Sequence, residues 1–212
     1  MRREQLSDDV VIYQADCLEI RDELIADCVV SDPPYGMEWD TDTTRFPRGR
    51  NDWPEIIGDD APFDPAPWLG YKRVILWGYH YFAQRLPHAA VLVWMKKRPD
   101  KYGTFLSDCE LAWFSNGVGV YAHEAASGQF GRNAESGLGR PAHPMQKPIS
   151  LMQWCVGKTE GVVLDPYMGS GTTGVACVRM RRPFIGVEIQ PQYFEAALRR
   201  IDGELKQGRL FD

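Results

Sequence analysis

The chain has 212 residues, 44% of them apolar, with a formal net charge of −5 and a pI near 5.4. This length suits one sizeable domain, or one domain with a small insertion, and the acidic balance excludes a protein coated in positive charge. No apolar run approaches the ~18 residues that span a bilayer, and no signal-like segment follows the N-terminus, so we expect a soluble, cytoplasmic protein without a membrane partner.

Short apolar runs alternate with segments of helical periodicity, which predicts an α/β fold with a doubly wound sheet. In chain order, the predicted strands cover residues 10–13, 28–31, 73–77, 90–95, 110–114, 162–164 and 184–187. The predicted helices cover residues 17–25, 80–86, 149–157, 172–180 and 191–206. The sequence contains no internal repeat, so we expect a single domain over residues 1–212 with one insertion.

The tetrapeptide Asp32-Pro33-Pro34-Tyr35 follows the apolar run Cys28-Val29-Val30. Its two prolines fix φ and remove two backbone donors, leaving carbonyl acceptors without competing N–H groups. Asp32 adds an anionic acceptor and Tyr35 a stacking surface, which together suit a flat base carrying an exocyclic amine. Acceptors that hold the N–H bonds of such an amine favour its pyramidal form, whose lone pair can attack an electrophile. A proline-rich turn capped by Asp32 explains the same four residues equally well.

A glycine-rich loop lies near the other end of the chain, where residues 161–174 read as a buried strand, a loop and the start of a helix. Gly169, Gly171 and Gly174 satisfy the G-x-G-x-x-G fingerprint, and Glu188 follows 19 residues after Gly169, where an acid can bind ribose hydroxyls. The pattern predicts a nucleoside-bearing cofactor but does not distinguish NAD from S-adenosylmethionine. A tight strand-to-helix turn without a ligand is the alternative.

Together, these motifs resemble those of DNA amino-methyltransferases of the beta arrangement, the S-adenosylmethionine-dependent class that methylates N6 of adenine or N4 of cytosine. In that class the DPPY motif lies near the N-terminus and the glycine-rich loop near the C-terminus, as here. Residues 13–17 (YQADC) resemble the strand end whose acid approaches the cofactor adenine, with Ala15 replacing the usual glycine. Residues 143–148 (HPMQKP) resemble the segment that reaches the methionine end. The resemblance covers nearly the whole chain except about residues 41–70 and 99–142.

The resemblance implies a Rossmann-like methyltransferase sheet with a short target-recognition insertion, and it assigns roles to residues. Tyr35 is expected to stack on a base flipped out of double-stranded DNA, while Asp32 and the Pro33 carbonyl accept its N–H bonds and Pro34 completes the motif. The sulfonium methyl carbon is then attacked directly, and no metal is required. The expected cofactor-binding residues are Asp16 at the adenine, Glu188 at the ribose, Lys147 at the carboxylate, and Asp165, Gly169, Ser170, Gly171 and Thr172 at the methionine portion, together with Cys17 and Tyr167.

Two stretches lie outside the predicted sheet. Residues 41–70 follow the tetrapeptide, and we expect a flap loop over the flipped base. Residues 99–142 lie where the family places its target-recognition region, although a solvated glycine-rich loop is equally consistent with them. The side chains expected to reach base edges or phosphates there are those of Gln129, Arg132, Asn133 and Arg140.

Basic residues that could contact DNA phosphates gather mainly in one cluster. Lys96-Lys97-Arg98 with Lys101 follows a predicted strand, and a solvated charge run is the alternative interpretation. Further candidates, in the expected flap, are Arg45, Arg48 and Arg50.

Other functions remain open at this stage. Adenine N6 is the expected target because family members with DPPY are mostly adenine enzymes, whereas the cytosine enzymes usually have Ser at the position of Asp32; N4 of cytosine is the close alternative. An RNA or protein-glutamine amine would also suit a Pro-Pro-Tyr pocket, although those families more often have Asn first. An NAD-binding oxidoreductase leaves the tetrapeptide and Lys147 unaccounted for, and a non-enzymatic DNA-binding module does not need an intact cofactor loop.

The five cysteines are scattered and never in C-x-x-C spacing, so they predict neither a disulfide framework nor a zinc site. None follows a proline, whereas 5-methylcytosine enzymes use a Pro-Cys nucleophile, so methylation of carbon through a cysteine adduct is not expected. The resemblance leaves a homodimer and a paired restriction nuclease as open expectations.

Overall fold

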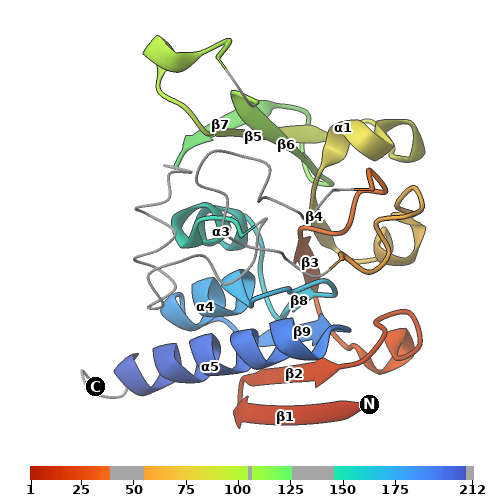
Figure 1. Cartoon of the computed structure of the whole chain (residues 1–212), viewed down its shortest axis with the longest axis vertical. Coiled ribbons are helices and arrows are strands. Elements are labelled where there is room, and N and C mark those ends of the chain that lie inside the picture. The colour runs from red at the N-terminus through yellow and green to blue at the C-terminus, as the bar shows by residue number, and fades with distance from the viewer. Residues whose placement is uncertain (39–54, 105–106, 126–145, 209–212) are drawn as a thin grey trace.

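The computed structural model of the chain describes residues 1–38, 55–104, 107–125 and 146–208. Within these residues, nine strands form one mixed sheet in the order β1-β2-β9-β8-β3-β4-β6-β5-β7 (Figure 1). The strands are β1 (Arg2–Ser7), β2 (Val10–Gln14), β3 (Cys28–Ser31), β4 (Arg73–Trp77), β5 (Ala90–Met95), β6 (Cys109–Phe114), β7 (Val120–Glu124), β8 (Val163–Asp165) and β9 (Phe184–Glu188).

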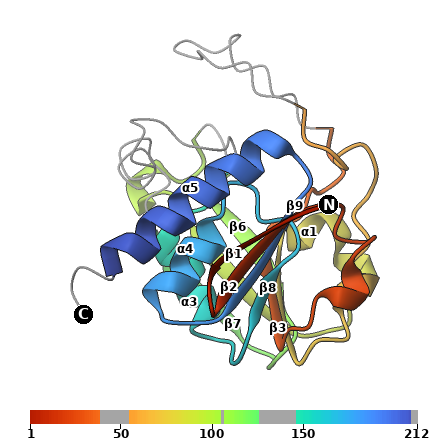
Figure 2. The same ribbon diagram turned by 90° about the horizontal axis from the view of Figure 1, so that it is seen from below.

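Helices cover both faces of the sheet, as a doubly wound fold requires. Figure 2 shows α3, α4 and α5 along one face, while α1 lies on the other. The helices are α1 (Tyr79–Phe82), α3 (Ile149–Val156), α4 (Thr172–Arg179) and α5 (Pro191–Gly208), and short 3-10 turns cover Arg21–Glu23, Ala66–Trp68, Ala83–Arg85 and Pro99–Lys101. None of the helices in the described residues has the length and hydropathy to cross a bilayer.

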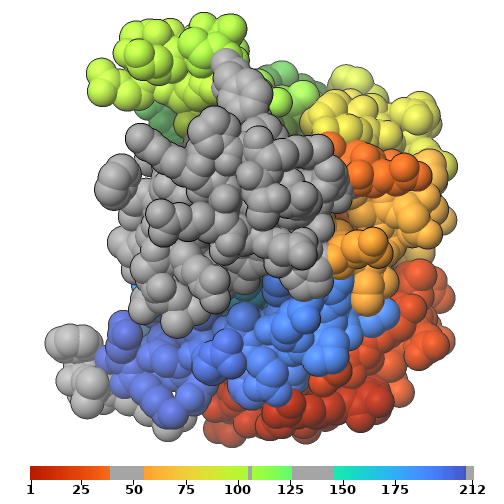
Figure 3. Space-filling model, viewed as in Figure 1, coloured from red at the N-terminus to blue at the C-terminus, as the bar shows by residue number. Residues whose placement is uncertain are grey.

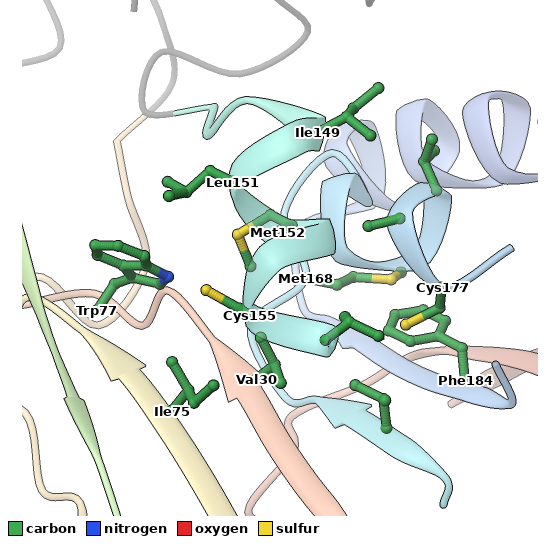
Figure 4. Close-up of a cluster of buried hydrophobic side chains, with 14 of the residues drawn as sticks. Val30, Ile75, Trp77, Ile149, Leu151, Met152, Cys155, Met168, Cys177 and Phe184 are labelled. Carbon is green, nitrogen blue, oxygen red and sulfur yellow. The ribbon is translucent and has the colours of Figure 1, made fainter. Parts of the chain in front are cut away.

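The two faces of the sheet carry two separate hydrophobic clusters. Figure 4 shows the cluster between the sheet and α3–α5, in which Trp77 and Ile75 of β4 face Met152 and Cys155 of α3. The cluster on the opposite face includes the fully buried Trp68. Because both faces of the central strands are covered, those strands are continuous apolar runs rather than alternating ones, and all four residues of β3 are buried.

Five neighbouring strands, β2, β9, β8, β3 and β4, run parallel. Their carboxyl ends therefore meet at one edge of the sheet, which is where ligands bind in open α/β sheets. The register pairs Gln14 with Glu188 and Asp165 with Gly186. The topology thus brings the segments after β2, β3, β8 and β9 together, although they are far apart in the sequence.

The seven predicted strands are confirmed, each within a residue or two of its predicted ends. The sequence did not predict β1 and β7, because both are edge strands with largely exposed side chains and no apolar alternation. The doubly wound α/β fold is confirmed.

Two helix predictions were wrong in length. Residues 17–25 form only the 3-10 turn Arg21–Glu23, in which Leu24 N–H bonds to the Arg21 carbonyl. Their apolar residues Ile20 and Leu24 are buried by a loop that lies against the sheet, so tertiary burial rather than a helix accounts for their spacing. Residues 80–86 are divided at Phe82, whose φ of −132° ends α1 before a 3-10 turn begins. The helices predicted at 149–157, 172–180 and 191–206 are confirmed.

Candidate active site

The carboxyl edge of the parallel strands holds two adjoining cavities. The larger, about 360 Å³, is lined by nine of the residues predicted from the sequence: Asp16, Cys17, Asp32, Pro33, Pro34, Tyr35, Tyr167, Gly169 and Glu188. The smaller, about 50 Å³, is lined by Lys147, Asp165, Ser170 and Thr172 among others. Asp32, Tyr167 and Gly169 line both cavities, so the tetrapeptide predicted to be catalytic and the glycine loop share a wall.

Gly171 is the one predicted site residue that lines neither cavity. It stands at the N-terminal end of α4 with φ +79°, and a Cβ there would lie 2.8 Å from the Cβ of Ala197. Glycine at this position therefore allows α4 and α5 to approach each other closely. Its contribution to the site is to the shape of the loop.

Asp32 and Tyr35 contact each other directly. The Tyr35 hydroxyl donates a hydrogen bond to Oδ1 of Asp32, and the Lys147 ammonium lies 2.6 Å from Oδ2. Burial raises the pKa of Asp32, and the neighbouring Lys147 charge opposes that shift. Lys147, expected at the cofactor carboxylate, thus engages the predicted catalytic acid in this structure.

The ring of Tyr35 is held by the strand-to-helix turn after β4. It stacks on Tyr81 of α1 with the ring centroids 5.0 Å apart and the planes 16° from parallel. Gly78, with φ +82°, lies against the ring edge, where an added Cβ would stand 2.1 Å from Cε1 of Tyr35. Only glycine leaves room for the tyrosine in this position.

Asp59 holds the backbone that follows the tetrapeptide. Its Oδ1 accepts the N–H groups of Tyr35, Gly36 and Met37 at 3.0, 2.9 and 3.3 Å. The side chain is only 5% exposed, so these bonds are shielded from water. The turn after Pro34 is therefore anchored from a segment more than twenty residues away.

Asp59 belongs to the stretch predicted as a flap, and residues 41–54 of that stretch lie outside the described residues. In the described part, Phe63 and Trp68 are buried in the core. The Glu55 carbonyl accepts a hydrogen bond from the Gln190 side chain, and Figure 3 shows this part in light orange beside the blue C-terminal residues. Residues 55–70 are thus packed against the sheet and form one wall of the larger cavity, while the flap stays a prediction.

The glycine loop is tied to the acid at the end of β9. Gly169 N–H donates to Oε2 of Glu188 at 2.9 Å, and Gln190 N–H donates to Oε1 at 2.8 Å. Burial raises the pKa of Glu188 to about 7 in spite of these two donors. Glu188 is therefore an acceptor at the cavity wall that changes charge near neutral pH.

Asp165 and Asp16 complete the acids of this edge. Asp165 accepts hydroxyl hydrogen bonds from Ser31 at 2.6 Å and from Thr173 at 2.5 Å, and burial raises its pKa to about 6. Asp16 accepts the Leu18 N–H at 2.8 Å, which holds the turn after β2. Both acids thus have local structural partners as well as positions at the cavity walls.

A family model for DNA methylases matches residues 121–199. A type II methyltransferase of Streptococcus pneumoniae, M2.DpnII, is 36% identical over 81 residues, which cover 37% of this chain and 30% of that protein. The crystal structure of the M1.HpyAVI–SAM complex matches with a TM-score of 0.56 at 22% identity, over 90% of this chain and 98% of that one. The PvuII DNA methyltransferase, which is cytosine-N4-specific, matches with a TM-score of 0.58 at 17% identity, over 92% and 89%.

The resemblance to the DNA amino-methyltransferases is confirmed. The matched segment spans less than a third of M2.DpnII, and the solved structures establish a shared fold. The nine-stranded sheet of the described residues is thus the methyltransferase sheet that the motifs predicted.

Four residues in contact with the predicted site residues were missed by the sequence reasoning: Asp59, Gly78, Tyr81 and Glu110. Glu110 lies within the apolar strand β6, and a carboxylate in such a strand is a signal that could have been followed. Asp59 and Tyr81 lie in segments whose composition is ordinary for turns and short helices, so their contacts emerge only from the tertiary structure.

The predicted DNA-contacting residues lie mostly beyond the described part of the chain. Residues 39–54 and 126–145 contain all of the following: Arg45, Arg48, Arg50, Gln129, Arg132, Asn133 and Arg140. In the described cluster, Lys96 pairs with Glu110 at 2.6 Å and Lys97 with Asp108 at 2.9 Å. Arg98 and Lys101 are more exposed, at 88% and 68%, and both lie near Asp100. These last two side chains are the better placed for a phosphate.

Proposed function

We propose that the chain is an S-adenosylmethionine-dependent DNA methyltransferase that acts on N6 of adenine after the base is flipped out of the duplex. The observation that carries this proposal is the position of Asp32, which lines both cavities and contacts Tyr35 and Lys147. A carboxylate at the junction of two cavities can hold an amine from one ligand beside a group carried by another. That arrangement suits group transfer to an amine.

The residues that line the two cavities are suited to bind S-adenosylmethionine. Glu188 and Asp16 offer carboxylate oxygens to ribose hydroxyls and to the adenine in the larger cavity. Lys147, Ser170 and Thr172 line the smaller cavity, where a cation and hydroxyls suit an amino-acid tail. When bound, S-adenosylmethionine supplies an electrophilic methyl group on a sulfonium.

The tetrapeptide would hold the target. Asp32 and the Pro33 carbonyl accept the N–H bonds of the exocyclic amine, and Tyr35, backed by Tyr81, stacks on the flipped base. Asp32 and the Pro33 carbonyl would hold the amine nitrogen toward the methyl carbon that the bound cofactor would supply, and the electrons of the carbon–sulfur bond would stay on sulfur. The methylated amine then loses one proton to solvent. Most of the rate enhancement comes from this positioning.

The test is to incubate the purified protein with methyl-labelled S-adenosylmethionine and mixed-sequence duplex DNA, digest to nucleosides, and identify the labelled nucleoside by mass spectrometry. We expect labelled N6-methyladenine. Labelled N4-methylcytosine would retain the chemistry and change only the base. Cofactor binding without label on DNA would refute DNA as the substrate and direct the search to an RNA or protein amine.

Double-stranded DNA is the proposed substrate, and it would reach the site from the side on which the carboxyl ends of the parallel strands lie. A homodimer, a paired restriction nuclease and a cytoplasmic location stay predictions, as does a single domain over residues 1–212.

A further inference from the structure

Four side chains of alternating charge form a row of ion pairs that runs from the predicted catalytic acid, Asp32, through Lys147 and Glu110 to Lys96. The Lys147 ammonium lies 2.6 Å from Oδ2 of Asp32 and 3.1 Å from Oε2 of Glu110. Oε1 of Glu110 is in turn 2.6 Å from the Lys96 ammonium. The Lys147 side chain is 4% exposed, whereas those of Asp32, Glu110 and Lys96 are 18–22% exposed, so the lysine is the most deeply buried member.

These four residues come from different parts of the chain. Glu110 is on β6, where its backbone pairs with Trp94 of β5, and Lys96 directly follows β5. Asp32 follows β3, and Lys147 precedes α3. Glu110 is thus fixed by a strand with hydrogen-bonded partners on both sides, whereas Asp32 and Lys147 stand on loops. β6 therefore fixes the position of Glu110 within this row of ion pairs.

We propose that Glu110 is a positioning residue for methyl transfer, which holds the Lys147 ammonium between two carboxylates and thereby sets the orientation and charge of Asp32. This inference rests on the proposed function, because Asp32 is the acid that would receive the amine. Glu110 lines neither cavity and acts through Lys147.

The need for a second carboxylate follows from burial. A buried ammonium tends to lose its proton unless nearby negative charge holds it. If Lys147 paired with Asp32 alone, the full positive charge would rest on Asp32 and weaken it as an acceptor for the amine. Because Glu110 shares the ammonium, Asp32 keeps more of its negative charge for the substrate while Lys147 still fixes the direction of Oδ2.

The surroundings of Lys147 leave these carboxylates as its main electrostatic partners. The Tyr35 hydroxyl lies 3.4 Å from its Nζ, and the faces of Trp77 and Trp94 lie 5.9 and 6.0 Å away. Among the described residues, Lys96 and Tyr81 act on Glu110, Asp165 acts on Asp32, and the buried thiol of Cys155 also interacts with Lys147. Burial alone would lower the pKa of Lys147, but Asp32 and Glu110 outweigh it and raise that pKa above the ordinary value. The pKa of Glu110 is lowered to about 2 because Lys147 and Lys96 outweigh its burial.

The first test is kinetic and compares Glu110→Gln with Glu204→Gln. Glu204 pairs with Arg179 away from the site, and its side chain has the same 18% exposure as that of Glu110. We expect Glu110→Gln to lower kcat for methyl transfer by about tenfold or more, with a smaller change in the KM for cofactor. We also expect the alkaline limb of its pH–rate profile to move to lower pH, because Lys147 loses a carboxylate that stabilises its charged form. Glu204→Gln should match the wild type in both respects.

The second test does not depend on methyl transfer. The lysine Cε resonances of protein labelled with 13C-lysine are titrated by NMR, and the Lys147 signal is assigned by its absence in Lys147→Arg. We expect the Lys147 pKa to be lower in Glu110→Gln than in the wild type and in Glu204→Gln. An unchanged Lys147 pKa would overturn the inference, as would a wild-type kcat and pH profile.

If Glu110→Gln does not fold, Glu110→Asp carries the test, because it keeps the charge but withdraws the carboxylate by one methylene; a wild-type kcat for that variant would overturn the inference. If the wild type methylates no DNA, the proposed function fails, and the lysine titration still decides whether Glu110 controls Lys147.

Discussion

The buried carboxylates of the site differ in the partners that hold them. Glu110 faces two ammonium groups and has a pKa near 2, whereas Glu188 is held by backbone N–H groups alone and has a pKa near 7. Asp165, held by two hydroxyls, has a pKa near 6. Burial raises the pKa of each carboxyl, and at Glu110 the two neighbouring ammonium groups reverse that shift. Side chains of one chemical type are thereby suited to different tasks within one site.

Removing the Asp32 carboxylate should separate binding from chemistry. We expect Asp32→Ala to abolish methyl transfer, because the amine loses its anionic acceptor, while S-adenosylmethionine still binds through Glu188 and the glycine loop. Turnover is measured with labelled cofactor and binding by calorimetry. Asp60→Ala, an exposed carboxylate of the segment that lines the cavity, is the control and should keep wild-type turnover. Near-normal turnover of Asp32→Ala would refute the catalytic assignment.

Cofactor affinity should depend on the charge of Glu188. Ribose hydroxyls donate to its ionised form, and the free protein holds the proton below pH about 7 because burial raises the pKa from its ordinary 4.5. Binding should therefore release a proton and tighten as pH rises from about 5 to 7, by up to about tenfold per pH unit.

Calorimetry in buffers of different ionisation enthalpy measures this proton release. Glu188→Gln should bind more weakly and lose the part of the pH dependence that belongs to Glu188. Parallel pH dependences for the wild type and Glu188→Gln would show that the residue does not titrate with binding.

At the scale of elements, the site depends on a turn that is braced from two directions. Asp59 holds the backbone of residues 35–37, and the turn after β4 places Gly78 and Tyr81 against the Tyr35 ring. Neither brace belongs to the DPPY motif itself. The motif supplies the groups proposed to hold the target amine, and the segments after it and after β4 fix their orientation.

Loss of the Asp59 brace should cost both stability and rate. Asp59→Ala leaves three N–H groups without their carboxylate acceptor, so we expect a loss of about 1–3 kcal/mol in the free energy of unfolding. A lower kcat should accompany it, because Tyr35 and Asp32 lose their fixed geometry. Denaturant unfolding and turnover are compared with Asp60→Ala, whose exposed side chain should have little effect. Equal stability of the two variants would contradict the bracing role.

For the molecule as a whole, electrostatics would limit how it holds DNA, the proposed substrate. The net charge is −5, and much of the positive charge in the described cluster 96–101 is paired within the protein. Arg98 and Lys101, joined to the single Asp100, retain an excess of positive charge near the end of β5. Figure 1 shows this end of the sheet far from α5. DNA affinity should therefore depend on a few local contacts.

The salt dependence of DNA binding measures these contacts. We expect the double variant Arg98→Gln/Lys101→Gln to reduce the slope of log Kd against log salt by about 1.8, from about 0.9 per phosphate contact. The matched control Arg199→Gln/Lys206→Gln removes two exposed positive charges from α5 and should leave the slope unchanged. Equal slopes for the two double variants would exclude Arg98 and Lys101 as phosphate contacts.

The sequence by itself determined the strands of the parallel core, because strands buried on both faces are continuous apolar runs that are visible without a partner. It also predicted many of the residues that line the cavities, because both motifs directly follow such strands and the carboxyl ends of parallel strands meet at one edge. The edge strands β1 and β7 were not visible, because half-exposed polar strands depend on pairing rather than on their own composition.

Only the tertiary structure decided how the site is held. Lys147 and Asp32 are 115 residues apart in the sequence, and Lys147 and Glu110 are 37 residues apart. The attraction between such groups depends on distance in space, which sequence spacing does not give. The same holds for Asp59, whose side chain accepts the N–H groups of residues 35–37 from a segment in which Phe63 and Trp68 are buried in the core. Local chemistry marked the reacting groups, and long-range packing selected their partners.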